Sequence, residues 1–220
     1  MMSILFKTEA YLPYDCFTTI FDIDYNKLYE NGKKIILIDI DNTIMPYDTS
    51  IPTSKELELF EKIQSIGFKV IFISNNHKNR VKSIADAFNV KYVYKAYKPL
   101  KSGFRRALKL IEYSDKKEII TIGDQMITDI LGSNRSKLDG ILVKPIKRKN
   151  EKWYTKLNRI SENRVIRKME KKYPEIAKKI IELRREIIEN KMWWLWCKNP
   201  NYKSKWKRIY KKWSIFEKPW

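Results

Sequence analysis

Two carboxylates separated by one residue follow directly after a short apolar run. Asp39 and Asp41 follow the run Ile35–Ile38, and Lys33 and Lys34 precede it. A run this short between polar residues is typical of a central strand in a parallel sheet. Side chains two positions apart on a strand point the same way, so both carboxylates are expected to face one pocket. Side by side they repel one another unless a cation lies between them.

An isolated Asp-x-Asp motif is also common in solvated turns, but here further apolar runs deliver polar residues in the same way. We predict strands over 69–73, 91–95 and 118–122, and these lead into Ser74, Lys98 and the stretch Gly123–Asp129. Ligands bind beyond the carboxyl ends of strands in open α/β sheets. The polar residues are therefore expected to gather at one edge of the sheet.

The segments between these strands carry apolar residues at helical spacing. The first helix is expected to begin at Thr53–Glu56, to bury Leu57, Phe60 and Ile63, and to end at Gly67. Two more are expected over 79–88 and 102–111, each with an apolar stripe that faces the core. Strands that alternate with helices predict a three-layer α/β fold with a parallel sheet.

Four features taken together resemble the haloacid dehalogenase (HAD) superfamily of phosphatases. They are the Asp-x-Asp-x-Thr motif at 39–43, Ser74, Lys98, and the Gly-Asp-x-x-x-x-Asp motif at 123–129. The resemblance implies that Asp39 is the nucleophile, which takes the phosphoryl group as an aspartyl phosphate. It also implies that Asp41 is the general acid, which protonates the leaving oxygen and later activates water. A carboxylate is a competent nucleophile toward phosphorus, and a second carboxyl group can donate the proton that the leaving oxygen needs.

The same resemblance implies a Mg²⁺ site. Asp39, the backbone carbonyl of Asp41 and Asp124 would hold the ion, and Asp129 would hold a metal-bound water. Oxygen ligands with retained waters suit magnesium. Ser74 and Lys98 would bind the phosphoryl oxygens, whose developing charge needs positioned donors. Thr43 and Asn75, which belong to the same motifs, complete the expected substrate-binding residues.

The spacing of the motifs leaves no room for a cap domain over the site. One helix and one strand use nearly all the residues between Ser74 and Lys98, and little more than a turn separates Asp41 from the helix near Thr53. An uncapped HAD-like Rossmannoid domain would stay open to bulky substrates. This favours a nucleic-acid end or a lipid head group over a small enclosed metabolite.

Further stretches are similar to a narrower group, the bacterial YqeG family of HAD type IIIA phosphatases. They are Tyr11–Pro13, Ile20–Asp24, Ile73–Asn76, Tyr94–Pro99 and Gly123–Arg135, within a likeness that covers roughly residues 10–168. That family is similar to phosphatidylglycerophosphate phosphatases. The resemblance therefore implies phosphatidylglycerol phosphate as the substrate and phosphatidylglycerol as the product.

The C-terminal third of the chain differs in composition. Residues 147–220 contain 24 Lys and Arg against 8 Asp and Glu, a net charge of +16 out of +20 for the whole chain. Six of the seven Trp lie after residue 190, and the other is Trp153. We therefore divide the chain into a HAD-like phosphatase domain over 1–150 and a basic, Trp-rich helical extension over 151–220.

Helical spacing recurs over 175–196, where Ile176, Ile180 and Leu183 alternate with basic residues, and Pro174 suits the first turn. A basic amphipathic helix with Trp on its apolar side is typical of an interfacial membrane anchor. Three alternatives remain: the helix docks on the catalytic domain, the Trp residues form a small separate core, or the segment binds RNA. The membrane is the favoured partner because the implied substrate is a lipid.

The sequence shows no apolar run long enough to span a bilayer and no secretory signal. Cys16 and Cys197 form no framework of pairs, which is typical of a reducing compartment. We therefore expect a cytoplasmic protein on the inner face of the membrane. A phosphatase for nucleic-acid ends or nucleotides, and a weakly catalytic module that binds membrane or RNA, are the alternative functions.

Overall fold

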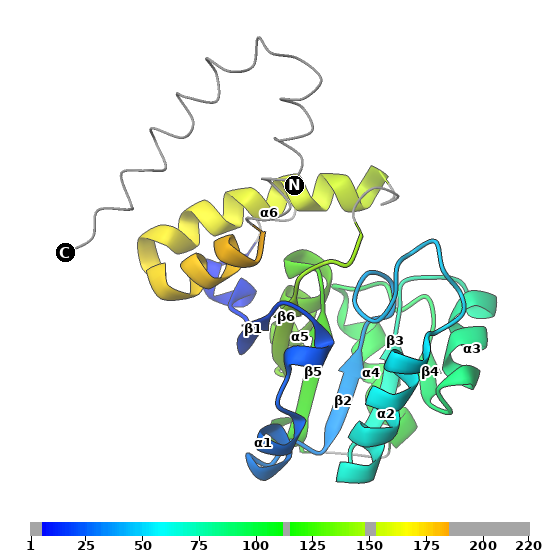
Figure 1. Ribbon diagram of the computed structural model, residues 1–220. Helices are drawn as coiled ribbons and strands as arrows, with labels where there is room; N and C mark the ends of the chain where they lie inside the picture. The colour runs from blue at the N-terminus through cyan, green and yellow to red at the C-terminus, as the bar shows by residue number, and fades with distance from the viewer. Residues whose placement is uncertain (1–5, 112–114, 148–152, 185–220) are drawn as a thin grey trace, which may run out of the picture. The chain divides into compact units, whose positions relative to one another are not determined.

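Six parallel strands form one sheet in the computed structural model, which describes residues 6–111, 115–147 and 153–184. The strand order is β1-β6-β5-β2-β3-β4 (Figure 1). The strands are β1 (Asp15–Phe17), β2 (Ile35–Ile38), β3 (Lys69–Ile73), β4 (Lys91–Val93), β5 (Ile119–Gly123) and β6 (Asp139–Val143). β2 lies between β5 and β3 with Ile38 level with Ile122 and Phe72, so the chain leaves β2 at the middle of the sheet edge.

The predicted parallel α/β fold is confirmed, and the four predicted strands lie where the apolar runs indicated. β1 and β6 were not predicted. β1 is only three residues long, and β6 contains Gly140, so neither carries the uninterrupted apolar run that marks a central strand. Both become strands because they extend the sheet beyond β5, where Ile141 pairs with Ile122 on one side and Asp15 on the other.

Helices alternate with the strands along the chain, and α6 follows the last strand. They are α1 (Tyr25–Glu30), α2 (Ser54–Ile66), α3 (Lys78–Ala87), α4 (Lys101–Ile111), α5 (Leu131–Arg135) and α6 (Trp153–Lys172), with a π-helical turn η5 (Met126–Ile130) ahead of α5. The three helices that the spacing predicted begin and end within one residue of their predicted bounds. α2 begins with a capping box in which the backbone N–H of Thr53 donates to Glu56 over 2.7 Å. It ends at Gly67, whose φ of 110° favours glycine.

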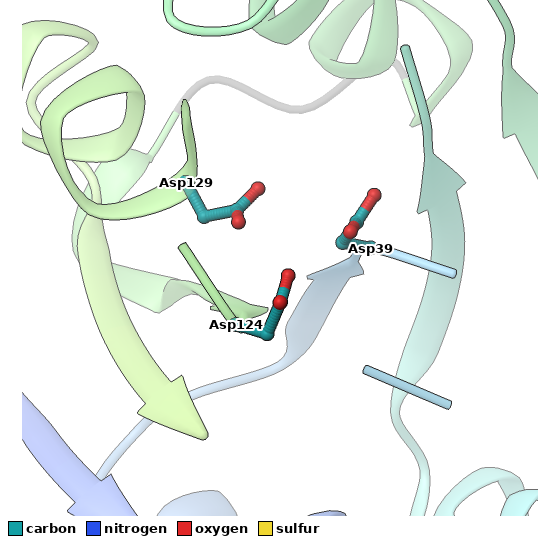
Figure 2. A group of neighbouring side chains, drawn as sticks. All are labelled: Asp39, Asp124 and Asp129. Carbon is teal, nitrogen blue, oxygen red and sulfur yellow. The ribbon is translucent and has the colours of Figure 1, made fainter. Parts of the chain in front are cut away.

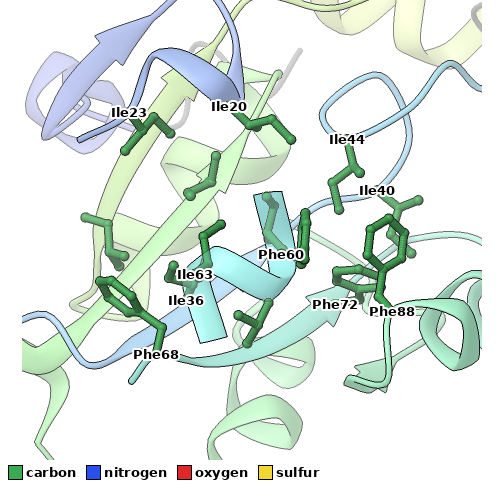
Figure 3. Close-up of a cluster of buried hydrophobic side chains, with 14 of the residues drawn as sticks. Ile20, Ile23, Ile36, Ile40, Ile44, Phe60, Ile63, Phe68, Phe72 and Phe88 are labelled. Carbon is green, nitrogen blue, oxygen red and sulfur yellow. The ribbon is translucent and has the colours of Figure 1, made fainter. Parts of the chain in front are cut away.

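Each face of the sheet is buried under helices. Ile36 and Ile38 belong to a cluster that contains Phe60, Phe72 and Phe88 (Figure 3). Ile35 and Leu37, which point the other way, belong to a second cluster together with residues of α4. Burying an Ile or Phe side chain contributes about 1.5–3 kcal/mol, so this alternation fixes the register of β2. Asp39, the next residue, is thereby held at the end of a rigid strand.

No additional domain is inserted near the site in the loops that the structure describes in full. Residues 39–53, between β2 and α2, contain no helix, and α3 alone fills the connection from β3 to β4. The predicted absence of a cap agrees with both connections. The carboxyl-end edge of β2 and β3 is therefore left uncovered by any inserted element.

A third apolar cluster joins the C-terminal helical segments to the sheet domain. Val165, Ile166 and Met169 of α6 pack with Met126 and Ile130 of η5, and helical residues 174–184 add Ile176, Ala177 and Ile180. The chain divides into units Met1–Leu183 and Arg184–Trp220. The structure thus groups 153–183 with the sheet, whereas composition had placed everything after residue 150 in an extension.

The packing of 174–184 bears on the predicted amphipathic helix over 175–196. On the apolar side expected of that helix, Ile180 is buried in the third apolar cluster and Ile176 is partly buried against it. The Trp residues after position 190 lie outside the described residues. Among the helices that the structure describes, none has the length and apolar character needed to cross a membrane.

Candidate active site

Three buried aspartates meet at the carboxyl ends of β2 and β5. Asp39 follows β2, Asp124 follows β5, and Asp129 lies on η5 (Figure 2). One carboxylate oxygen of each lies within 4.8 Å of the others. The backbone N–H of Asp39 donates to the carbonyl of Ile122 over 2.9 Å, which continues the β2–β5 pairing to Asp39 itself. The sheet itself therefore sets the distance between Asp39 and Asp124.

Lys98 bridges two of these carboxylates. Its Nζ lies 2.6 Å from Asp39 Oδ1 and 2.6 Å from Asp129 Oδ1, and all three side chains are buried. Burial opposes the charged form of Lys98, but the Asp129 and Asp39 carboxylates outweigh it and raise the pKa of the amine above its ordinary value. Lys98 is therefore a permanent cation against the site.

The loop that carries Lys98 is held by Asn75. The Asn75 side chain accepts from the backbone N–H of Lys98 over 2.7 Å and donates to its carbonyl over 3.1 Å. Ser74 is almost fully buried, and its Oγ accepts from the backbone N–H of Asn76 over 3.1 Å. The Ser74 hydroxyl proton is left to donate toward the site. Asn75 thus positions Lys98 through its backbone, a role that the sequence did not predict for it.

The charge balance of the aspartate cluster favours a cation. Burial raises the pKa of Asp39, and Asp129, Asp124 and Asp41 add to the effect against the opposing Lys98. Burial likewise raises the pKa of Asp124 to about 6, although the Arg159 guanidinium opposes it. When these carboxyl groups are ionised, each repels the next. A divalent cation would remove that repulsion.

The donor set fits a hard divalent ion. Asp124 Oδ1 is buried and has no hydrogen-bond partner among the described residues. An unpaired buried carboxylate oxygen is costly, and a metal ion is the usual way to satisfy one. All the side-chain ligands on offer are oxygens, which Mg²⁺ and Ca²⁺ prefer. The side chain of Asp41 is not part of this cluster.

Asp41 is instead held by two residues of the next connection. Arg80, on the first turn of α3, donates to Asp41 Oδ1 from Nε over 3.0 Å and from Nη2 over 2.7 Å. Asn76 donates to Asp41 Oδ2 over 3.2 Å. Arg80 also lies against the ring of Tyr47 at 5.3 Å. Both carboxylate oxygens of Asp41 are therefore oriented before any substrate arrives.

A second arginine reaches the site from α6. Arg159 is buried and donates from Nη1 to the backbone carbonyl of Asp124 over 2.7 Å and from Nη2 to its carboxylate. Glu162, fully buried one turn further on, lies 3.5 Å from Arg159 and accepts from the backbone N–H of Ile127 over 3.3 Å. α6 is thus joined to the turn that presents Asp124 and Asp129.

A cavity of about 240 Å³ opens at this edge of the sheet. Five residues that the sequence singled out line it: Asp39, Asp41, Ser74, Asn75 and Lys98. Thr155 and Asn158 of α6 line it from another side. Thr43 is buried and is not among the lining residues, so its role in substrate binding stays a prediction. Asp124 and Asp129 are not among the lining residues.

The sequence prediction did not include Arg80, Asn76, Arg159 or the lining residues of α6. Arg80 had one usable signal: it stands on the first turn of a predicted helix that follows Ser74, and that turn lies at the same edge as the strand end. Arg159 lies 35 residues from Asp124 in the chain and had no comparable signal.

The arrangement can carry out acid and base chemistry on an anion. Asp39 offers a carboxylate oxygen to the cavity, Asp41 offers a second carboxyl group, and Lys98 with Ser74 offers donors for anionic oxygens. The aspartate cluster behind them fits a metal ion that would offset the negative charge. These are the parts that group transfer to a carboxylate requires.

Comparison with known proteins agrees with this geometry. The chain is 36% identical over 164 residues to the probable phosphatase YqeG of Bacillus subtilis (strain 168), covering 74% of this chain and 94% of that protein. Similar solved structures include an uncharacterized protein from Listeria monocytogenes serotype 4b, with 17% identity, a TM-score of 0.44 and coverage of 54% of this chain and 85% of that one. Another is the putative HAD-hydrolase YfnB from Bacillus subtilis, with 13% identity, a TM-score of 0.40 and coverage of 54% and 90%. The family profile of the haloacid dehalogenase-like hydrolases matches residues 6–136. The chain therefore belongs to the haloacid dehalogenase-like hydrolases.

Proposed function

We propose that the chain is a Mg²⁺-dependent phosphatase that removes the terminal phosphate of phosphatidylglycerol phosphate through an aspartyl-phosphate intermediate. The observation that carries the phosphatase assignment is the position of Asp39. It lines the cavity, pairs with Lys98 at 2.6 Å, and shares the aspartate cluster with Asp124 and Asp129. The similarity to a probable phosphatase of Bacillus subtilis supports the same reaction class.

In the first half of the reaction, a carboxylate oxygen of Asp39 attacks phosphorus as the bond to the leaving alcohol breaks. Asp41 donates a proton to the departing oxygen, so that the alcohol leaves neutral. Lys98 and Ser74 donate hydrogen bonds to the phosphoryl oxygens, whose charge is greatest in the transition state. Mg²⁺, held by Asp39 and Asp124, would offset the charge of the phosphoryl group.

In the second half, Asp41 takes a proton from water, which attacks the phosphorus of the aspartyl phosphate. The P–O bond to Asp39 breaks, and inorganic phosphate leaves with the nucleophile regenerated. Arg80 and Asn76 hold the Asp41 carboxyl group by both oxygens and so keep it aimed at one place through both proton transfers. The same group can then serve as acid and as base.

The lipid assignment is supported by less specific features. The similarity to YqeG covers most of both chains, and the sequence motifs resemble a family that is similar to phosphatidylglycerophosphate phosphatases. No inserted domain covers the edge of the sheet at β2 and β3, so a head group on a membrane surface could approach the cavity. The basic residues after position 184 would attract the enzyme to an anionic inner leaflet from the cytoplasmic side.

The same basic region also favours a second candidate, a phosphatase for nucleic-acid ends. Lys, Arg and Trp together bind phosphate backbones and stack on bases as readily as they bind membranes. The site residues contact the phosphoryl group in either case. Only the substrate preference distinguishes the two functions.

The test is phosphate release, with Mg²⁺ present, from phosphatidylglycerol phosphate in mixed micelles and from a 5′-phosphorylated oligonucleotide. Wild type is compared with Asp39→Asn, which removes the nucleophile, and with Asp86→Asn, which makes the same change at an exposed carboxylate of α3. We expect lipid turnover that Asp39→Asn abolishes and Asp86→Asn retains. Turnover of the oligonucleotide alone would transfer the assignment to nucleic acid, and turnover of neither would reject the phosphatase.

A further inference from the structure

α6 lies beyond the stretch that the HAD-like family profile matches, yet it forms part of the active site. The profile ends at residue 136, and α6 begins at Trp153. Figure 1 shows α6 across the end of the sheet at which β5 and β6 finish. Thr155 and Asn158 of this helix line the same cavity as Asp39 and Asp41. The cavity therefore has one wall that the family core does not supply.

The wall is held rigidly against the catalytic turn. Arg159 is hydrogen-bonded to the carbonyl of Asp124 over 2.7 Å, and Glu162 accepts from the backbone N–H of Ile127 over 3.3 Å. Below these polar contacts, Val165 and Met169 pack into the cluster that contains Met126 and Ile130. Buried polar contacts with satisfied geometry and apolar packing fix the helix in both position and rotation.

The chemistry of the two lining side chains suits an uncharged, hydroxyl-bearing group. Thr155 and Asn158 are three residues apart on a helix and so share one face. A hydroxyl and a carboxamide each donate and accept hydrogen bonds but add no charge. The charge of the phosphoryl group is met elsewhere, by Lys98 and by the divalent cation that the aspartate cluster would hold. The alcohol part of the ester is therefore the part that the lining side chains of α6 are left to bind.

We propose that Thr155 and Asn158 form a leaving-group subsite that hydrogen-bonds the hydroxyl groups of a polyol ester such as a glycerol phosphate. α6 then gives this uncapped enzyme the specificity that an inserted cap could otherwise provide. The inference rests on the proposed phosphatase function and names its substrate class. The glycerol of phosphatidylglycerol phosphate, with its free hydroxyl between two phosphates, is one member of that class.

The experiment compares sn-glycerol 3-phosphate with n-propyl phosphate, which has the same carbon chain and no hydroxyl group. The readout is the ratio of kcat/KM for the two soluble esters, measured on full-length protein with Mg²⁺. Thr155→Val removes the hydroxyl at nearly constant volume, Thr155→Ser keeps it, and Asn158→Ala removes the carboxamide. Ile160→Ala, at a position that is 56% exposed on the same helix, is the control.

A neutral hydrogen bond changes an equilibrium by about two- to tenfold. We therefore expect wild type to prefer the glycerol ester, and Thr155→Val and Asn158→Ala each to lower that preference by about this factor. Thr155→Ser and Ile160→Ala should keep it. Equal preference in wild type, or variants that slow both esters alike, would overturn the subsite.

A second measurement separates this proposal from the phosphatase assignment. The dissociation constants of the two esters are measured by calorimetry on Asp39→Asn protein, with and without Thr155→Val or Asn158→Ala. Turnover of neither ester by wild type, with phosphatidylglycerol phosphate and the oligonucleotide also left intact, would reject the phosphatase, and the binding ratio would still decide the subsite. Retained preference for the glycerol ester in both double variants would reject the subsite while leaving the phosphatase intact.

Discussion

Arg80 donates two hydrogen bonds to a single oxygen of Asp41, from Nε over 3.0 Å and from Nη2 over 2.7 Å. The other oxygen of Asp41 accepts from Asn76 over 3.2 Å. The proposed acid and base is therefore oriented by two side chains that follow β3, while the proposed nucleophile is set by β2. The end of β2 thus positions the carboxyl group of Asp39, and residues that follow β3 position that of Asp41.

The first prediction concerns Arg80. Arg80→Ala should lower kcat by about 10- to 100-fold, because a misplaced acid and base loses part of the 10²- to 10⁴-fold contribution typical of such groups. KM should change little, since Arg80 is not among the cavity-lining residues. Steady-state kinetics with a soluble phosphomonoester measure both values. Arg105→Ala, at an exposed position of α4, is the matched control.

A structural role alone would give a different result for Arg80. Loss of packing would lower the melting temperature and the amount of active enzyme, but it would leave the kcat of each folded molecule in place. A misplaced Asp41 should instead lower kcat in protein that stays folded, which thermal unfolding measured beside the kinetics checks. An unchanged kcat would contradict the positioning role.

The second prediction concerns Arg159. Arg159→Ala removes the buried cation beside Asp124 and Glu162, and we expect the free energy of unfolding to fall by about 3–5 kcal/mol. Added Mg²⁺ should restore part of the loss, because a ligand that binds the folded state stabilises it by mass action. Urea unfolding with and without Mg²⁺ measures both effects. Arg164→Ala, exposed on the same helix, should change stability little, and an equal loss in both variants would count against the network.

The third prediction is a pH dependence of metal binding. Burial raises the pKa of Asp124 from 3.8 to about 6, so in metal-free protein this carboxyl holds a proton that Mg²⁺ must displace. The affinity for Mg²⁺ should therefore rise with pH through about 6 and then level off. Isothermal titration between about pH 5 and about pH 7.5 tests this, and a flat affinity across the range would contradict it.

The raised pKa of Asp124 makes the stability of metal-free protein fall as pH rises, whereas the affinity for Mg²⁺ rises. The folded carboxyl binds its proton more tightly than the unfolded one, so the folded state is favoured at low pH by this group. That contribution is lost as pH rises from about 4 to about 6. Saturating Mg²⁺ should reverse the trend, since the metal-bound carboxylate is stable when ionised. Thermal unfolding with chelator and with Mg²⁺ distinguishes the two slopes.

The fourth prediction concerns the basic residues after position 184. Reversing the charge of Lys203, Lys205 and Lys207 to Glu should weaken binding to anionic vesicles by at least about tenfold, because each basic residue contributes about 1 kcal/mol near such a surface. Co-sedimentation with vesicles that contain phosphatidylglycerol measures this. Lys55→Glu with Lys62→Glu, both exposed on α2, changes charge without touching this region and should have a smaller effect. Loss of RNA binding with vesicle binding unchanged would favour nucleic acid as the partner.

Local sequence determined the central part of the fold. The run Ile35–Ile38 forms a strand because alternate side chains can be buried on both faces of a sheet. α2 begins at the Thr53 capping box and ends at Gly67 because those residues satisfy its terminal backbone groups. Asp39, Ser74 and Lys98 then meet because parallel strands end at a common edge. Each of these outcomes depends on residues that are close in the chain or on one rule of topology.

Tertiary structure decided what depends on contacts between distant residues. Arg80 reaches Asp41 across 39 residues, and Arg159 reaches Asp124 across 35. The sequence does not show whether an arginine on a helix contacts solvent or a buried carboxylate, because the helical pattern indicates only which face is apolar. The third apolar cluster places α6 against η5 and brings Thr155 and Asn158 to the cavity. The sequence alone determined the edge of the sheet at which the aspartates meet. The packing of α6 decided which residues form the remaining wall of the cavity, because the side chains of η5 that hold this helix are distant from it in the chain.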